Sequence, residues 1–149
     1  MKKVILGLFT VIFLSIPTLA QEKLMVVYLY EKGSKHYQIV NDKILKDKYL
    51  AKRINKSFNF YRIELGTEPS QRFINRYGLE NTEGVFFIDP STGKVLYKLT
   101  DFSKPCRCAN LINYFSRNLH KKGIDPDRYL EMAEKLGAYQ RKVEKDYLF

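Results

Sequence analysis

Cysteine is scarce in this chain, because Cys106 and Cys108 are the only two among its 149 residues. Two cysteines cannot supply a scaffold that depends on several disulfides, and a domain of this size does not need a disulfide to fold. The two thiols are therefore either incidental or chemical. The sequence also lacks a glycine-rich phosphate loop, a Ser/His/Asp set and paired catalytic carboxylates, which argues against the common nucleotide-binding and hydrolytic classes.

Acidic residues are the minority charge, with 16 Asp and Glu against 26 Lys and Arg, for a formal net charge of +10. The basic residues are scattered along the chain, which is typical of a solvated surface. Their functional interpretation is attraction to an anionic surface, such as a membrane or cell wall, or to an acidic partner. No nucleic-acid-binding module accompanies this charge, so we expect no nucleic-acid partner.

Long apolar runs are absent except at the N-terminus, where residues 4–16 follow the positive pair Lys2 and Lys3. This run is short for a membrane anchor, and Thr18 and Ala20 supply the small residues of a signal-peptidase site. The pattern predicts a secretory signal peptide over residues 1–20 and a periplasmic or secreted protein. A retained N-terminal membrane helix is the alternative, and no membrane span is expected after cleavage.

The remaining chain reads as one domain over residues 21–123 followed by an amphipathic C-terminal helix over residues 124–149. Apolar and alternating patterns predict strands at 23–30, 58–65, 84–89 and 94–100. Helical spacing predicts helices at 37–55, with a break at Asp47, and at 68–77 and 103–122. A last helix starts at Asp125 and Pro126, and its apolar face is expected to pack on the domain through Tyr129, Met132, Leu136 and Val143.

This order is β-α-β-α-β-β-α plus one extra helix, which predicts an α/β fold. Its core is a central mixed four-stranded sheet with helices on both faces. Several segments resemble the thioredoxin-like family, in particular its small periplasmic, sulfur-oxidation-associated members. They are VVYLY at 26–30, YRIEL at 61–65, RYGLENT at 76–82 and the hairpin GVFFIDPSTGKVLYKL at 84–99.

Two positions depart from the pattern of that family. The resemblance places a Cys-x-x-Cys pair where this chain has Ser34 to Tyr37, and a cis-proline where it has Glu83. A serine hydroxyl cannot replace the attacking thiolate, so the usual dithiol mechanism is absent from its usual place. Because a cis bond before a residue other than proline is costly, we expect a trans bond at Glu83.

The resemblance also implies that this edge of the domain faces a peptide. It therefore favours a non-enzymatic protein- or peptide-binding module, or a chaperone-like one, with an exported protein or peptide as its partner and without a cofactor. Glu83 is expected either to be solvated or to pair with Lys35. The predicted binding edge consists of Ser34, Lys35, His36, Tyr37, Thr82, Glu83 and Phe102.

An alternative function uses the two thiols, with Cys106 and Cys108 as the catalytic pair of an atypical thiol-disulfide oxidoreductase. The resemblance places the start of the closing helix, and hence both thiols, near His36 and Glu83. Two residues that are two apart on a helix diverge by about 200°, however, which would bury Cys108 and expose Cys106. A weaker hypothesis joins the thiols and His36 in a copper or zinc site. The sequence leaves open whether the protein is an enzyme.

Overall fold

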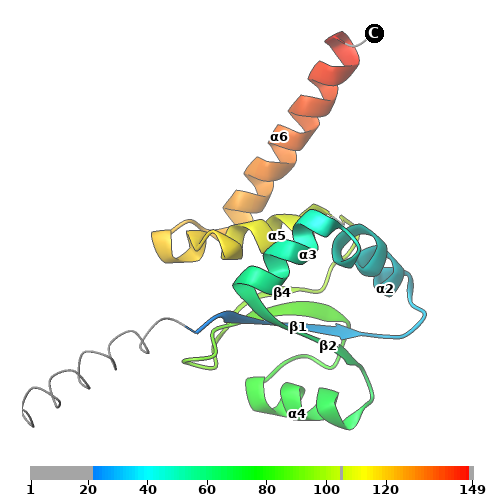
Figure 1. The fold of residues 1–149 in the computed structure, drawn as a ribbon, viewed down its shortest axis with the longest axis vertical. Helices are drawn as coiled ribbons and strands as arrows, with labels where there is room; N and C mark the ends of the chain where they lie inside the picture. Colours follow the sequence, from blue (N-terminus) through cyan, green and yellow to red (C-terminus); the bar gives the residue numbers. More distant parts are fainter. Residues whose placement is uncertain (1–21, 105, 148–149) are drawn as a thin grey trace, which may run out of the picture.

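A computed structural model describes residues 22–104 and 106–147, with side chains described as far as residue 137. The predicted signal peptide lies outside these residues. The four predicted strands are present as β1 (Leu24–Tyr30), β2 (Phe58–Glu64), β3 (Gly84–Ile88) and β4 (Val95–Leu99). They form one mixed sheet in the order β2-β1-β3-β4, in which β1 is parallel to β2 and antiparallel to β3, and β3 is antiparallel to β4 (Figure 1).

The helices between the strands are present, although the first begins at Lys35 rather than residue 37 and places His36 on a helix, and the second ends at Ser57 rather than residue 55. α2 (Lys35–Val40) continues into a π-helical turn, η2 (Asn41–Leu45), and the break at Asp47 is confirmed because its carboxylate caps α3 (Lys48–Ser57). Asp47 accepts a hydrogen bond from the Leu50 N–H at 2.9 Å. α4 (Glu68–Tyr77) ends at Gly78, which has a left-handed φ of 63°.

The predicted helix over 103–122 is in fact two pieces, which corrects the sequence-based expectation. α5 (Cys106–Ser116) ends where Asn118 takes a φ of 55°, and a 3₁₀ turn, η3 (Leu119–Lys122), follows. A residue in the left-handed region cannot continue a right-handed helix, so the chain changes direction here. After Gly123 it enters α6 (Pro126–Tyr147).

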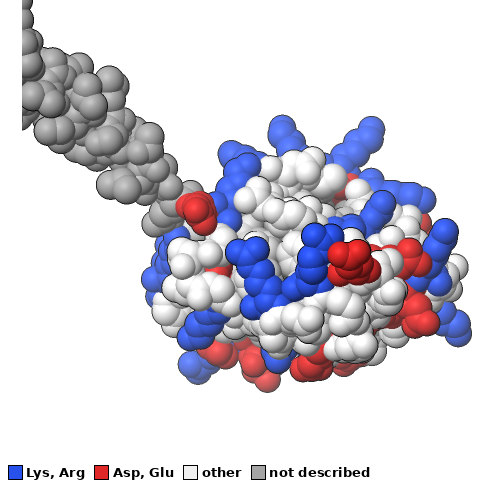
Figure 2. All heavy atoms as spheres, turned by 90° about the horizontal axis from the view of Figure 1, so that it is seen from below, with Lys and Arg blue, Asp and Glu red and all other residues white. Residues whose placement is uncertain are grey.

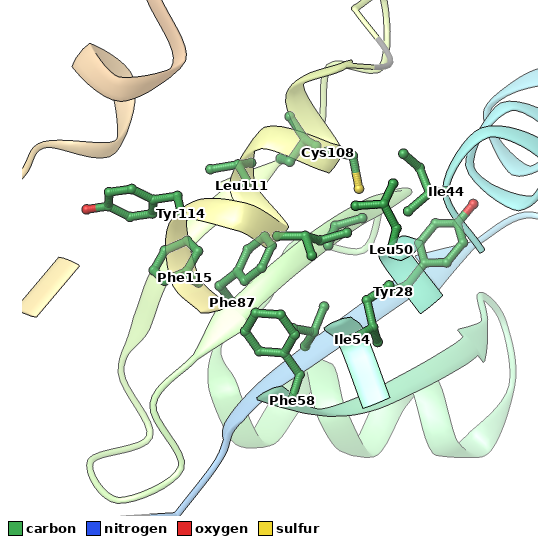
Figure 3. Close-up of a cluster of buried hydrophobic side chains, with 14 of the residues drawn as sticks. Tyr28, Ile44, Leu50, Ile54, Phe58, Phe87, Cys108, Leu111, Tyr114 and Phe115 are labelled. Atoms are coloured by element: carbon green, nitrogen blue, oxygen red, sulfur yellow. The ribbon is translucent and has the colours of Figure 1, made fainter. Parts of the chain in front are cut away.

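Alternate residues of β1 divide the core between the two faces of the sheet. Val26 and Tyr28 belong to the larger cluster, on the side of α3 and α5, where the ring of Phe87 stacks on that of Phe115 at a centroid distance of 4.5 Å (Figure 3). Val27 and Leu29 belong to the smaller cluster, on the side of α4. Helices therefore cover both faces, as expected (Figure 1).

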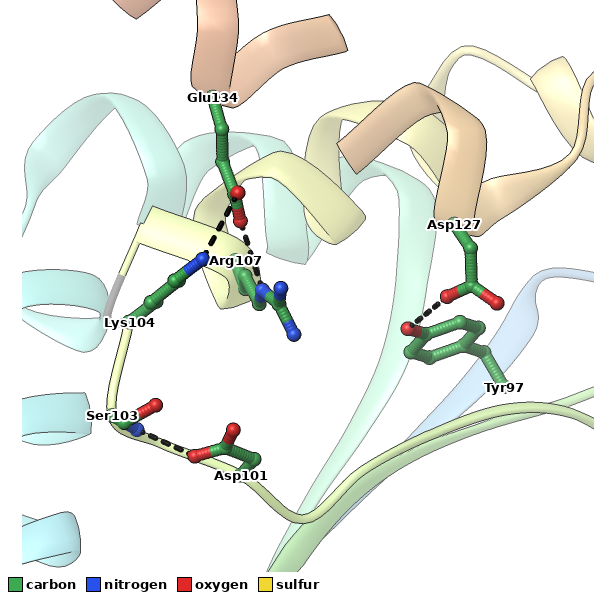
Figure 4. A network of polar contacts seen from close by, with 7 residues as sticks. All are labelled: Tyr97, Asp101, Ser103, Lys104, Arg107, Asp127 and Glu134. Carbon is green, nitrogen blue, oxygen red and sulfur yellow. Dashed lines mark hydrogen bonds and ion pairs between the residues drawn. The ribbon is translucent and has the colours of Figure 1, made fainter. Parts of the chain in front are cut away.

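The first turns of α6 are attached to the domain by apolar and polar contacts. Leu130 is buried and the ring of Tyr129 lies 5.3 Å from that of Tyr114. The Tyr97 hydroxyl donates to Asp127 at 2.7 Å, and Glu134 pairs with both Lys104 and Arg107 (Figure 4). These contacts hold the N-terminal turns of α6 against α5 and β4.

Further along, α6 extends away from the sheet (Figure 1). Met132 and Leu136 are each 60% exposed, so the expectation that they pack on the domain is wrong, whereas that for Tyr129 is confirmed. The side chain of Val143 lies outside those described. The helix leaves the domain surface after its first turns. Its later apolar residues, Met132 and Leu136, are therefore not buried although they keep a helical spacing.

Charged residues on the face that carries α4 are mixed in sign. Lys and Arg side chains are spread over this face, and acidic side chains lie between them and along its lower edge in the view (Figure 2). Within residues 22–104 and 106–147, no helix has the length and apolarity that a membrane crossing requires.

Candidate functional site

The end of β1 and the start of α2 are joined to the loop before β3 by one serine and one carboxylate. Ser34 is the N-cap of α2, and its Oγ accepts a hydrogen bond from the Tyr37 N–H at 3.0 Å. The same hydroxyl donates to Glu83 Oε1 at 2.5 Å, and that oxygen also accepts from the Glu31 N–H at 2.7 Å. We call this set of contacts among Glu31, Ser34 and Glu83 the Ser–Glu clamp.

The clamp contradicts both expectations for Glu83. Its carboxylate is neither free in solvent nor bonded to Lys35, because it bonds to a hydroxyl and a backbone amide 49 and 52 residues earlier in the chain. The described residues contain no cis peptide bond, which confirms the trans bond expected here. A charged acceptor thus holds together two loops in the region where the sequence predicted a binding edge.

Three tyrosines extend from the clamp into the core. The ring of Tyr37 lies 4.7 Å from that of Tyr30, which lies 5.7 Å from that of Tyr28. Burial, followed by the nearby charge of Glu83, raises the pKa of Tyr28 well above its ordinary value, so its phenol stays neutral. Tyr28 and Tyr30 were not among the predicted site residues, although tyrosines two apart on a strand are a signal of one shared face.

The other predicted edge residues differ in exposure. Lys35, His36 and Thr82 are exposed, and Tyr37 is half-buried. Phe102 is only 3% exposed and belongs to the core, so its expected place on an accessible rim is wrong. Phe102 still contacts the predicted edge, because its ring packs against the ring of His36 at a centroid distance of 5.2 Å.

The two cysteines are not brought together. α5 begins at Cys106, so the predicted divergence on a helix is confirmed: Cys106 is exposed, Cys108 is 4% exposed, and both are free thiols. Burial raises the pKa of Cys108 to about 12, so its nucleophilic thiolate is essentially absent near neutral pH. The geometry therefore gives little support to a Cys106–Cys108 dithiol.

The structure does place the start of α5 on the side of α2, as the resemblance implied (Figure 1). Phe102 lies four residues before Cys106 in the chain, and its ring contacts that of His36 on α2. Among the described residues, however, no three His, Cys, Asp or Glu side chains gather as metal ligands would. Cys106, Cys108 and His36 form no such group.

Comparisons with known proteins give structural matches only. Neither a scan of protein-family models nor a search of curated proteins returned a match. A solved thioredoxin-fold protein from Helicobacter pylori superposes with a TM-score of 0.59 at 14% identity, covering 81% of this chain and 86% of that one. A thioredoxin from Thermus thermophilus superposes with a TM-score of 0.51 at 18% identity, covering 68% and 81%. Sheet order, helix placement and these superpositions together show that this chain has a thioredoxin-like fold.

Proposed function

We propose that this thioredoxin-like protein is an exported binding module that holds a protein or peptide partner, in a chaperone-like role and without dithiol exchange. The binding edge consists of the exposed and half-buried groups around the Ser–Glu clamp, namely Lys35, His36, Tyr37 and Thr82. At this edge the partner is held by non-covalent contacts, and no covalent bond to it forms.

The observation that carries the proposal is the clamp itself. It uses the Ser34 hydroxyl both as donor and as acceptor, so no free nucleophile remains at that position. It also fixes the loop of Glu83 beside α2. Groups that are held before binding lose less entropy when a partner arrives, which favours a preorganised recognition surface.

The exposed groups have the chemistry of peptide recognition. Tyr37 rests on Tyr30 and His36 rests on Phe102, so two amphipathic rings are supported from below while parts of them face solvent. Rigid aromatic groups of this kind give contact area at a small entropic cost. Lys35 adds a positive charge beside them, which suits an unfolded segment containing both apolar and acidic residues.

The test measures how well the purified protein suppresses the aggregation of a chemically denatured client protein, followed by light scattering. We expect suppression by the wild type, a loss of at least about half of it in the double variant His36→Ala/Tyr37→Ala, and full retention in Cys106→Ser. Circular dichroism melting of each variant separates loss of binding from loss of folding. Sequencing of the protein recovered outside the cytoplasm should give Gln21 as its first residue.

Two outcomes would contradict the proposal. If Cys106→Ser abolished activity and the wild type reduced a disulfide client, the alternative of a thiol-disulfide oxidoreductase would replace it. If the double variant, still folded, suppressed aggregation as well as the wild type does, the binding edge would be wrongly placed.

A further inference from the structure

A hollow lies away from the binding edge, between α3 and the end of α5, which contact one another along the same face of the sheet (Figure 1). Its volume is about 400 Å³. Three of its lining side chains are cationic, two are hydroxyls and one is aromatic. The lining residues are Tyr49, Lys52, Arg53, Lys56, Ser57 and Ser116.

Positive charge in this hollow is uncompensated within the described residues. α3 contains four basic residues and no acidic one, and none of its cations that line the hollow is paired with a described carboxylate. Lys52 and Lys56 are four apart on the helix, a spacing at which like charges repel and weaken the helix. An anion bound between them would relieve this repulsion.

The central cation, Arg53, is held in position before any ligand arrives. Its Nη1 donates to Ser116 Oγ at 3.2 Å, its Nη2 contacts the Tyr49 hydroxyl, and its guanidinium carbon lies 4.9 Å from the centroid of the Tyr49 ring. Ser116 Oγ in turn donates to the Asn113 carbonyl at 3.1 Å. A guanidinium has five N–H donors, so this anchoring leaves several for a ligand in a fixed geometry.

We propose that this hollow is a binding site for a phosphomonoester, a site separate from the binding edge. A phosphomonoester carries up to two negative charges and three terminal oxygens, which matches one guanidinium, two ammonium groups and the Ser57 hydroxyl. A single carboxylate would neutralise only one of the three cations. The hollow exceeds the volume of the phosphate group, so the organic part of the ester can lie against the exposed ring of Tyr49.

The experiment titrates the purified protein with glycerol 3-phosphate by isothermal calorimetry. We expect saturable one-to-one binding that Arg53→Gln weakens about tenfold or more, because it removes a charged, bidentate partner. Lys56→Gln is the second variant, since Lys56 is exposed and is not part of an ion pair with a described carboxylate, and we expect about a threefold loss. The control is Lys43→Gln on η2, which removes an equal charge outside the hollow and should change affinity less than about twofold.

Vesicles distinguish the two sources of a phosphomonoester. If phosphatidic acid in phosphatidylcholine vesicles binds the wild type, Arg53→Gln weakens that binding and glycerol 3-phosphate competes, the ligand is a lipid headgroup. If only the soluble ester binds, the ligand is a free phosphomonoester. The absence of saturable binding to either probe would overturn the proposal, as would equal losses in Lys43→Gln and Lys56→Gln, which would indicate diffuse attraction to the net charge.

Discussion

Ser34 shows how one hydroxyl changes the chemistry of a position. It donates to Glu83 and accepts from the Tyr37 N–H, so it caps a helix and ties a distant loop at the same time. An alcohol held in this way has no tendency to ionise near neutral pH, unlike a thiol at a helix N-terminus. At the scale of single residues, the hydroxyl at position 34 supplies fixed geometry and no reactive nucleophile.

The two thiols provide a direct test at this scale. We expect an aromatic disulfide reagent at pH 8 to modify Cys106 rapidly, whereas Cys108 reacts only after denaturation. The reason is that Cys106 is exposed, while burial raises the pKa of Cys108 to about 12. The measurement is the absorbance of the released thiolate, with Cys106→Ser as the control that abolishes the fast phase. Two fast thiols, or an oxidised form that lacks two hydrogens, would contradict this geometry.

α6 allows a matched comparison at the scale of secondary structure. Leu130 is 3% exposed and Leu136 is 60% exposed on the same helix. We expect Leu130→Ala to lower the free energy of unfolding by about 2–4 kcal/mol, because it leaves a cavity in the core. Leu136→Ala should change it by less than about 0.5 kcal/mol. Denaturant unfolding of both variants measures the difference, and equal losses would mean that Leu136 packs on the domain after all.

The attachment of α6 also depends on pH through Glu134. Its hydrogen bonds to Arg107 and then Lys104 hold the pKa of this carboxyl below its ordinary value. Its contribution to stability is therefore complete above that ordinary value and is lost as the pH falls through the lowered one. We expect Glu134→Gln to melt at a lower temperature than the wild type at pH 7, and the two melting temperatures to converge in acid.

Circular dichroism melting across this pH range checks the Glu134 prediction, and Glu131→Gln is a suitable control because Glu131 is an exposed acid on the same helix. A difference between wild type and Glu134→Gln that persisted unchanged in acid would exclude the ion pair as its cause.

At the scale of the whole molecule, local signals predicted most of the fold. The apolar and aromatic run of β1, the cap at Asp47 and the glycine at the end of α4 each depend on a few neighbouring residues, so a sequence pattern can reveal them. The break at Asn118 was missed because Leu119 continues the apolar spacing of α5, and no glycine marks the left-handed position. The apolar pattern alone therefore predicted a single helix over the residues that form α5 and η3.

Contacts between distant segments were the part that could not be predicted. The bond from Ser34 to Glu83 joins residues 49 apart, and nothing near either residue specifies the other. Amphipathic spacing in α6 likewise identified apolar residues but not which of them would find a surface, since that depends on how far the helix stays on the domain. The resemblance to a family predicted where a binding edge lies, and only the three-dimensional arrangement showed which contacts join the two loops there.

The Ser–Glu clamp has a consequence for how such a protein could change over evolutionary time. Introducing a cysteine at Ser34 alone would set its sulfur against the Glu83 carboxylate, whose negative charge disfavours the reactive thiolate. A useful redox centre would therefore require simultaneous changes at Ser34, Tyr37 and Glu83, and the intermediate sequences would have neither a firm edge nor an active thiol. The clamp therefore makes it unfavourable for this chain to gain a reactive thiol at this position by one substitution at a time.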